Sequence, residues 1–208
     1  MKPKKCKWCK TEFTPFNSLA QVCSYECSIA LARSNGLKKM EQITKEKRKE
    51  MKEKNKTLGD YKKELQIKIN KIVRLIDFNC KCLACGTNEG KFDASHFRGV
   101  QAWDNLRYNL FNIYSGCAQC NTYRGGNLIK FREGIVKEFG NDIINYMDDL
   151  NTIYPFIKLY KSDLIELTEK CNGIIKELTE LNKTIQTRSI LERIELRKKY
   201  NLLLGIYI

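Results

Sequence analysis

Cysteines are the residues with the clearest chemistry in this 208-residue chain, and eight of the ten stand in two sets of four. Each set consists of two close pairs, in the patterns C-x2-C-x13-C-x3-C and C-x2-C-x31-C-x2-C. Two such pairs can converge to place four thiolates around a tetrahedral zinc ion, leaving no open coordination position. We therefore predict two structural zinc ions, held by Cys6, Cys9, Cys23 and Cys27 and by Cys82, Cys85, Cys117 and Cys120.

The other two cysteines, Cys80 and Cys171, are not expected to bind zinc. Cys80 lies two residues before Cys82 and competes with it in principle, although the C-x2-C spacing favours Cys82 with Cys85. Cys171 falls on the apolar face of an expected helix, where a thiol is usually an ordinary core residue. The charged N-terminus has no apolar stretch behind it, so we expect no secretory signal and a cytoplasmic location, where thiols bind metal.

A second chemical grouping lies between the two cysteine pairs of the second set. The segment FDASHFRG carries His96, the only histidine, with Asp93 three residues earlier, while Asn112 and Asn121 flank the last cysteine pair. Hydrolysis of a phosphodiester needs an activated water, a divalent cation for the developing charge and a group that orients the base. These four residues could supply all three, and four arginines surround them: Arg98, Arg107, Arg124 and Arg132.

Charge is distributed unevenly along the chain. The formal net charge is +14, and the first 79 residues hold 20 of the 38 basic side chains but only 9 of the 24 acidic ones. The stretch 38–56 is the most basic, and such a stretch suits the phosphate backbone of nucleic acid. A solvated helix that only keeps the protein soluble is the alternative. The expected DNA contacts are the four arginines and, from this stretch, Lys45, Lys47, Arg48 and Lys49.

The positioning elements are expected to be mainly helical. Residues 31–56 are typical of an exposed helix or a linker, and the apolar spacing after Leu58 predicts a packed helix ending near Asp77. Short extended pieces are expected at 92–97 and 109–114, followed by a helix at 121–139 closed by Gly140. No apolar run approaches the roughly 18 residues of a membrane span.

The last third predicts two amphipathic helices. One face carries Leu164, Leu167, Cys171 and further apolar residues to Ile185, with Ser162 and Asp163 as capping candidates. A second helix from Ser189 carries Ile190, Leu191, Ile194 and Tyr200. The two helices can form a hairpin on the core or a contact between two copies of the chain.

The segment from Cys82 to Arg132 resembles the NinG/Rap family of lambdoid phage recombination proteins. The resemblance is carried by FDASHFRG, NLRYNLFNIYSGCAQCN and RGGNLIKFR, and the order of modules extends it over about residues 1–140. More distantly the pattern is similar to HNH, or ββα-metal, endonucleases. The resemblance implies a nuclease for Holliday junctions and D-loops, with a β-hairpin and a helix around a catalytic divalent ion. It also implies that the protein is located in the cytoplasm of a bacterial host.

The resemblance also implies roles for individual residues. His96 would be the general base, Asn112 the residue orienting its imidazole, and Asp93 and Asn121 ligands of a catalytic Mg²⁺ or Mn²⁺. Family members often have histidine at the positions of Tyr114 and Tyr123, and glycine at that of Ser95. Any metal or leaving-group role of those histidines is therefore lost or replaced, and both tyrosines stay candidates for phosphate contact or packing.

The expected fold class is α+β and mainly helical. We expect an N-terminal zinc module at 1–30, a basic helix or linker at 31–57, a zinc-braced HNH-like nuclease core at 58–140 and a C-terminal helical hairpin at 141–208. Branched DNA is the expected partner, and a homodimer and recombination proteins are further candidates. Two alternatives remain open: a non-catalytic nucleic-acid-binding recombination accessory protein, and a protein-interaction scaffold.

Overall fold

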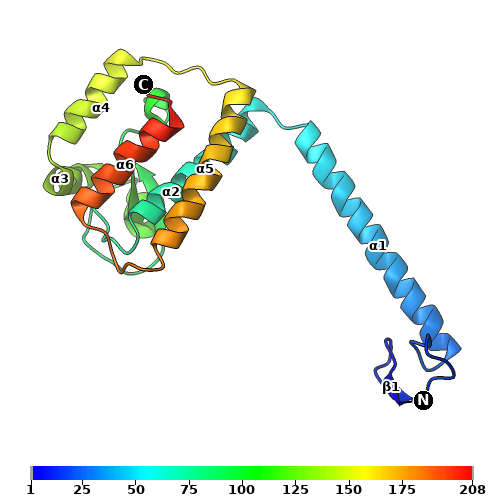
Figure 1. Ribbon diagram of the computed structural model, residues 1–208. Helices are drawn as coiled ribbons and strands as arrows, with labels where there is room; N and C mark the ends of the chain where they lie inside the picture. Colours follow the sequence, from blue (N-terminus) through cyan, green and yellow to red (C-terminus); the bar gives the residue numbers. More distant parts are fainter. Residues whose placement is uncertain (1, 208) are drawn as a thin grey trace. The chain divides into compact units, whose positions relative to one another are not determined.

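The computed structural model describes residues 2–207 and contains two compact units, Met1–Lys56 and Thr57–Ile208 (Figure 1). The expected α+β class, mainly helical with small sheets, is confirmed: each unit contains one two-stranded sheet. Within the described residues, no helix combines the length and the apolar character that a membrane crossing needs.

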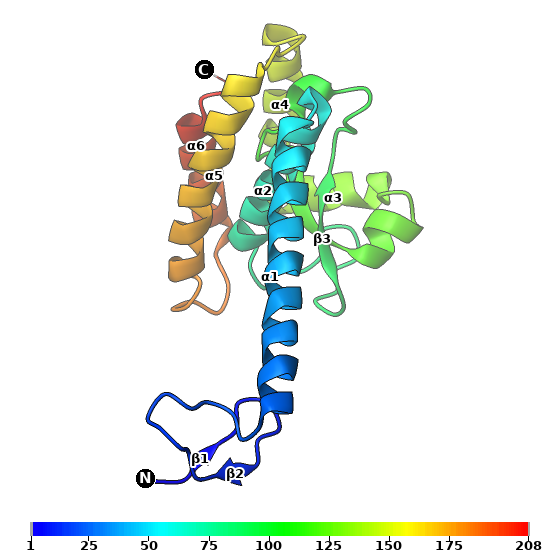
Figure 2. The same cartoon turned by 90° about the vertical axis from the view of Figure 1, so that its right-hand side faces the viewer.

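The first unit consists of a small cysteine-bearing module and one long helix (Figure 2). Strands β1 (Lys4–Lys5) and β2 (Glu12–Phe13) pair antiparallel, and α1 (Tyr25–Lys54) follows. The Ser24 side chain caps α1 by accepting a hydrogen bond from the Cys27 backbone N–H at 3.3 Å. The stretch expected as helix or linker is thus a helix, and no residue of α1 is buried.

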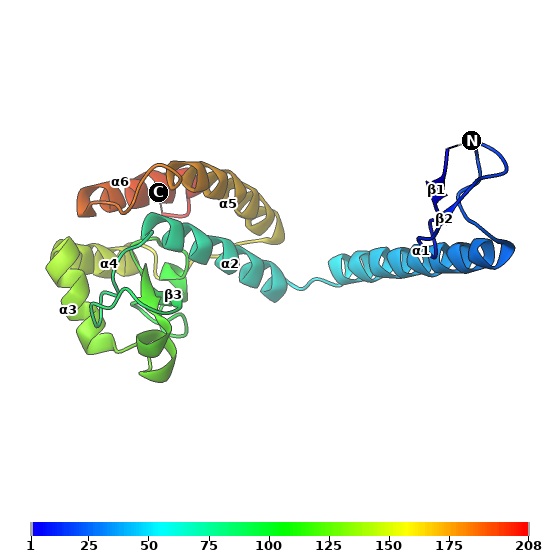
Figure 3. The same cartoon turned by 90° about the horizontal axis from the view of Figure 1, so that it is seen from below.

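Helix α2 (Leu58–Ile76) forms the centre of the second unit, between the β3–β4 hairpin and α5 (Lys161–Leu181) (Figure 3). A capping box between Thr57 and Asp60 starts the helix. Most of the apolar spacing read from the sequence is confirmed: the buried side chains of α2 and α5 are Tyr61, Leu65, Ile69, Ile72, Val73 and Ile76, and Leu164, Leu167, Cys171, Ile174 and Leu178. Leu58 and Leu181 are exposed, and Ile185 lies beyond the end of α5.

Strands β3 (Phe92–His96) and β4 (Ile113–Cys117) form an antiparallel hairpin with a long loop that contains the 3-10 turn η1 (Asp104–Leu106). The register pairs Phe92 with Cys117 and His96 with Ile113. The second extended piece therefore begins at residue 113, later than expected. Residues 109–112 are loop, fixed by backbone hydrogen bonds such as the one from the Asn112 N–H to the Asn109 carbonyl.

The expected helix at 121–139 is wrong at its start. A π-helical turn η2 (Gln119–Tyr123) comes first, and α3 (Leu128–Phe139) begins only after three residues with positive φ. Gly125, Gly126 and Asn127 have φ of 56°, 88° and 48°, values that a right-handed helix cannot contain. The stop at Gly140 is confirmed, and α4 (Asp142–Ile153) packs against α3.

Helix α6 (Ile190–Leu204) differs from the amphipathic helix that the sequence predicts. Of the predicted apolar residues, Tyr200 is buried, whereas Ile190 and Leu191 are 41% and 75% exposed. The other buried residues of α6 are Arg193, Arg197, Asn201 and Leu204. The predicted face is wrong at Ile190 and Leu191 because most of the buried face of α6 is polar. Helix α6 contacts α2, α3 and α5, so the last two helices join the core of residues 57–208.

The polar face of α6 is neutralised by Asp77, which directly follows α2 and is 3% exposed. Its carboxylate accepts hydrogen bonds from Arg193 Nε (2.9 Å), Arg197 Nη2 (2.8 Å) and the backbone N–H of Ser115 (2.9 Å). Burial disfavours the charged carboxylate, but the charges of Arg197 and Arg193 and the Ser115 N–H outweigh it and lower the pKa of Asp77.

Asp77→Asn should lower the free energy of unfolding by about 3–5 kcal/mol, because two buried guanidinium groups lose their counter-charge. The wild-type contribution is present above the unfolded carboxyl pKa of about 4 and is lost as the pH falls through the lower folded pKa. Urea unfolding between pH 3 and 7 measures both effects. The exposed Asp149→Asn is the matched control, and equal stability of the two variants would contradict this account.

Gly134 in α3 marks a close approach of two backbones. A β-carbon at this position would lie 2.0 Å from the carbonyl oxygen of Leu83, within the second cysteine set. Gly134→Ala should therefore destabilise the fold by about 1–3 kcal/mol. Gly173→Ala in α5, where a β-carbon meets no atom within 4 Å, should instead stabilise it by about 0.5–1 kcal/mol. Thermal denaturation compares the two variants, and we expect a lower melting temperature than wild type for Gly134→Ala and a higher one for Gly173→Ala.

Candidate metal and nucleic-acid site

The first cysteine set is brought together as predicted. The sulfur atoms of Cys6, Cys9, Cys23 and Cys27 all lie within 4.8 Å of one another, with 3.5 Å between Cys9 and Cys23 and 3.6 Å between Cys23 and Cys27. Tetrahedral zinc with bonds of about 2.3 Å requires sulfur separations of about 3.8 Å, close to those found. Desolvation opposes ionisation of Cys6, but backbone hydrogen bonds from Cys23, Cys9 and Trp8 lower its pKa to about 6, which favours a thiolate.

The second set is equally compact: Cys82, Cys85, Cys117 and Cys120 have their sulfur atoms within 4.8 Å, with 3.6 Å between Cys85 and Cys117. Two tight turns supply these ligands. The first closes through the hydrogen bond from the Gly86 N–H to the Cys82 carbonyl (2.8 Å), and Gly86 has a φ of 74°. In the second, the Cys120 N–H points at the Cys117 sulfur at 3.4 Å. Both sets can therefore hold zinc.

The other two cysteines lie outside these sets. Cys80 Sγ contacts the carbonyl of Phe78 and the hydroxyl of Thr187, and burial raises the pKa of its thiol. Cys171 is fully buried in the core between α2 and α5, and burial raises its pKa to about 12. A thiol held neutral in the core is a poor metal ligand, which agrees with the sequence-based reading of Cys171.

Two oxygen-bearing side chains meet beside the second cysteine set. The Ser95 hydroxyl donates to Asn121 Oδ1 at 2.6 Å, so β3 is linked to the π-helical turn that follows Cys120. Asp93 lies two residues before Ser95 and therefore shares its face of the strand. Gly116 leaves room for this pair, because a β-carbon there would approach Ser95 Oγ to 3.1 Å. A carboxylate, a hydroxyl and an amide on one face are oxygen donors that suit Mg²⁺ or Mn²⁺.

His96 lies on the other face of β3, since side chains alternate along a strand. Its neighbours on that face, Ala94 and the paired Ile113, pack into the core around α2. The imidazole Nε2 is 3.0 Å from the carbonyl oxygen of Arg107. Burial lowers the pKa of His96, and the nearby charge of Arg107 adds to this, against a hydrogen bond that raises it. His96 is therefore neutral near pH 7, but it is not assembled with Asp93 and Asn121.

Asn112 was expected to orient the imidazole of His96, and the structure gives it a different task. Its Oδ1 accepts from the Arg98 N–H at 2.7 Å, and its Nδ2 donates to the carbonyl oxygens of Arg98 and Leu106, both at 3.1 Å. All the hydrogen-bonding groups of this fully buried amide thus close the loop between β3 and β4. The carbonyl of Arg107, which the sequence could not reveal, orients the imidazole instead.

The four arginines divide into two pairs. Arg98 Nη2 is 2.6 Å from Asp148, and its guanidinium covers the Phe97 and Trp103 rings; Arg107 Nε donates to Gln66 at 3.0 Å. Arg98 and Arg107 are therefore occupied within the fold. In contrast, Arg124 and Arg132 are exposed and form no ion pair within residues 2–207. They lie on the η2–α3 segment, which also carries Asn121.

The two tyrosines, Tyr114 and Tyr123, at positions where the resemblance leads us to expect histidine, differ in exposure. Tyr114 is fully buried and packs against Phe131 and Phe139, so it cannot contact a phosphate in this fold. Tyr123 is 77% exposed, one residue before Arg124. Lys45, Lys47, Arg48 and Lys49 are all exposed on α1, as expected for either a DNA contact or a solvated helix.

Sequence reasoning missed Ser95, which it treated only as a substitution for glycine. The available signal was its spacing, because residues two apart on a strand share a face and Ser95 follows Asp93 by two. It also missed the orienting role of the Arg107 carbonyl, for which no sequence signal exists.

Comparison with known proteins gives the family of the chain. The family model described as the bacteriophage lambda NinG protein matches residues 1–182, which include both cysteine sets. The chain belongs to the NinG family. The NinG protein of Escherichia phage 933W is 30% identical over 160 residues, which cover 70% of this chain and 80% of that protein. The NinG protein of Salmonella phage P22 is 30% identical over 154 residues, which cover 66% of this chain and 76% of that protein. The NinG protein of Escherichia phage lambda is 29% identical over 162 residues, which cover 70% of this chain and 79% of that protein. No solved structure matches.

The resemblance to NinG proteins read from the sequence is thus confirmed, whereas its HNH-like part stays a prediction. The match ends at residue 182, so α6 with its buried arginines lies beyond it. Membership implies a role connected with phage recombination.

We expect two zinc ions per chain by plasma emission spectrometry of the purified protein. Cys85→Ser and Cys23→Ser should each lower the zinc content to about one, because each disrupts one four-sulfur set. Cys80→Ser and Cys171→Ala are matched controls and should keep two. A Cys80→Ser variant with one zinc would show that Cys80 is a ligand, and a zinc-free wild type would contradict both sites.

Proposed function

We propose that this NinG-family protein is a metal-dependent, structure-selective endonuclease that cuts branched recombination intermediates such as Holliday junctions and D-loops. The observation that carries the proposal is the Ser95–Asn121 hydrogen bond with Asp93 on the same strand face. It gathers oxygen ligands beside a cysteine set that fixes both the hairpin and the following turn. Branch selectivity follows from the family's connection with phage recombination.

In this proposal the Asp93 carboxylate and the Asn121 amide oxygen hold Mg²⁺ or Mn²⁺, and the Ser95 hydroxyl orients the amide. The divalent ion supplies charge stabilisation at the scissile phosphate and lowers the pKa of the attacking water. The side chain of Asp93 is 29% exposed, and its Oδ1 lies 3.5 Å from Nζ of the exposed Lys91, so a cation can reach the carboxylate from the solvent side. Arg124 and Arg132, exposed on the following segment, would neutralise flanking phosphates.

His96 is proposed as the general base. In the tautomer that donates Nε2–H to the Arg107 carbonyl, Nδ1 carries a free lone pair, and the lowered pKa keeps the ring neutral. Because His96 faces the α2 side of the hairpin, this role requires the end of β3 to turn when DNA and cation bind. Catalytic contacts that tighten only in the substrate complex are common, so His96 stays a candidate.

DNA contacts are assigned to α1 in the first unit and, separately, to Arg124 and Arg132 in the second unit. Lys45, Lys47, Arg48 and Lys49 lie on a helix without buried residues, so all four are available to phosphates. Arg98 and Arg107 are not assigned to DNA binding, because their side chains already interact with Asp148 and Gln66. A homodimer would suit the two-fold symmetry of a junction. However, the apolar face of α5 proposed for that contact is buried against α2 within the chain.

A second candidate function is a DNA-binding recombination accessory protein without catalysis. The separation of His96 from Asp93 and Asn121 favours it, because the only imidazole of the chain is not assembled with the oxygen ligands. Tight junction binding that weakens steeply with salt, without cleavage in either Mg²⁺ or Mn²⁺, would establish it.

We expect purified protein to cut a labelled four-way junction and a D-loop in Mg²⁺ or Mn²⁺, and linear duplex far more slowly. Asp93→Asn and Asn121→Ala should lower the single-turnover rate by about a hundredfold, since each removes a proposed ligand of the cation. His96→Ala should lower it by about 10²- to 10⁴-fold, the usual contribution of a general base. Gel-resolved cleavage products measure all three.

Asp149→Asn and Asn172→Ala, both exposed and away from the hairpin, are the matched controls and should cleave like wild type. Wild-type cleavage by His96→Ala would remove His96 from the mechanism and leave the oxygen ligands in place. Wild-type cleavage by Asp93→Asn and Asn121→Ala would overturn the proposed cation site.

A further inference from the structure

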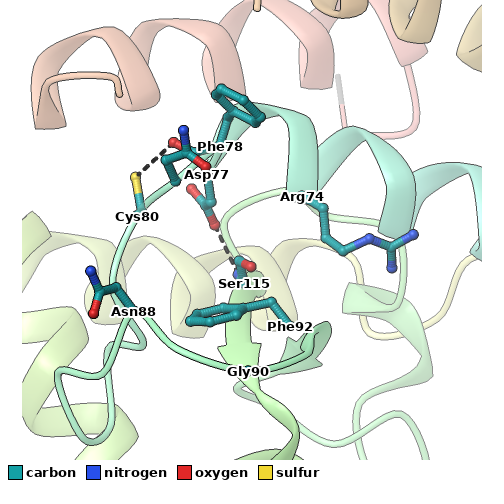
Figure 4. A pocket seen from close by; sticks show the side chains of 9 residues that line it. Arg74, Asp77, Phe78, Cys80, Asn88, Gly90, Phe92 and Ser115 are labelled. Carbon is teal, nitrogen blue, oxygen red and sulfur yellow. Dashed lines mark hydrogen bonds between the residues drawn. The ribbon is translucent and has the colours of Figure 1, made fainter. Parts of the chain in front are cut away.

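A cavity of about 350 Å³ opens on the α2 side of the hairpin (Figure 4), and its lining includes neither Asp93 nor Asn121. It lies where the end of α2 meets the cysteine-bearing loop and the end of the β3–β4 hairpin at which Phe92 pairs with Cys117. Its walls include Arg74, Asn88, Phe92 and Ser115, with Asp77 at its inner side. A volume of this size is within the lower range of sites for small organic ligands.

Several polar side chains of this cavity have no partner within residues 2–207. Arg74 is exposed on α2 and Asn88 on the loop, and neither side chain forms a hydrogen bond or ion pair with the described residues. The Ser115 side chain is 5% exposed, and its hydroxyl likewise has no hydrogen bond among the described residues. The Ser115 hydroxyl lines the cavity and can both donate and accept a hydrogen bond, so it is available to a polar ligand.

The aromatic and electrostatic character narrows the ligand class. Phe92 is half-buried, and Figure 4 shows its ring lying across the cavity below Asp77 and Ser115. Asp77 is the one carboxylate of the lining, and its charge is already compensated by Arg193 and Arg197. Arg74 therefore leaves a net positive charge at the cavity. The lining suits a flat ring with polar edges that carries a negative group.

We propose that this cavity binds a single unpaired nucleotide of the branched DNA. The base would stack on Phe92, its edge would meet Asn88 and Ser115, and its phosphate would contact Arg74. The proposal rests on DNA binding by this protein. It adds that the protein recognises a branch point by binding an unstacked base. A free mononucleotide has the same chemistry, so the experiment separates the two sources.

The test compares two four-way junctions by fluorescence anisotropy with the zinc-loaded full chain in buffer without added divalent ions. One junction is fully paired, and the other carries one extra unpaired 2-aminopurine at the branch. We expect about tenfold tighter binding of the second junction, with quenching of the 2-aminopurine fluorescence by stacking. Arg74→Ala and Asn88→Ala should abolish the preference while binding of the fully paired junction changes less than twofold.

Lys63→Ala, which removes another exposed charge of α2, is the matched control and should keep the preference. Phe92→Leu should remove the quenching, and the polar variants carry the test if this one fails to fold. Equal affinity of wild type for both junctions, or a preference that survives Arg74→Ala and Asn88→Ala, would overturn the proposal. Competition by 2-aminopurine mononucleotide at the affinity of the DNA would reassign the cavity to a free ligand.

This experiment is independent of cleavage. A wild-type protein that shows the unpaired-base preference but never cuts would overturn the endonuclease and support the nucleotide site. A protein that cuts junctions but binds both substrates equally would support the endonuclease and overturn the nucleotide site.

Discussion

The buried carboxylate of Asp77 is the interaction on which the second unit depends. It joins the end of α2 to the guanidinium groups of α6 and to the backbone of β4, three elements far apart in the sequence. Without this charge, the polar face of α6 could not be buried, because an unpaired guanidinium in the core is costly. The hairpin that carries Asp93, Ser95 and His96 is thereby held against α2 at its centre.

Much of this fold could be predicted because its signals are local. The cysteine pairs lie on tight turns, and the buried faces of α2 and α5 follow from apolar residues at helical spacing. The face of α6 could not be predicted in this way, since its buried residues are Arg193 and Arg197. Their partner lies more than a hundred residues earlier, so no local pattern identifies it.

The candidate site was predictable in its residue types but not in its geometry. Proximity in the sequence suggested that Asp93 and His96 act together, yet a spacing of three on a strand puts them on opposite faces. Similarly, Arg98 and Arg107 are near the site in sequence but are occupied by Asp148 and Gln66. Such competition for partners depends on tertiary contacts that composition and motif spacing do not contain.

Helix α1 has thirty residues and no buried side chain, so tertiary packing contributes little to its stability. Helices of this kind depend on their first turn, because nucleation is the costly step of helix formation. In this chain the first turn contains Cys27, which belongs to the first cysteine set, and the capping Ser24 follows Cys23. Zinc bound there would act as a helix nucleus, so that metal occupancy sets the helicity and reach of the basic arm.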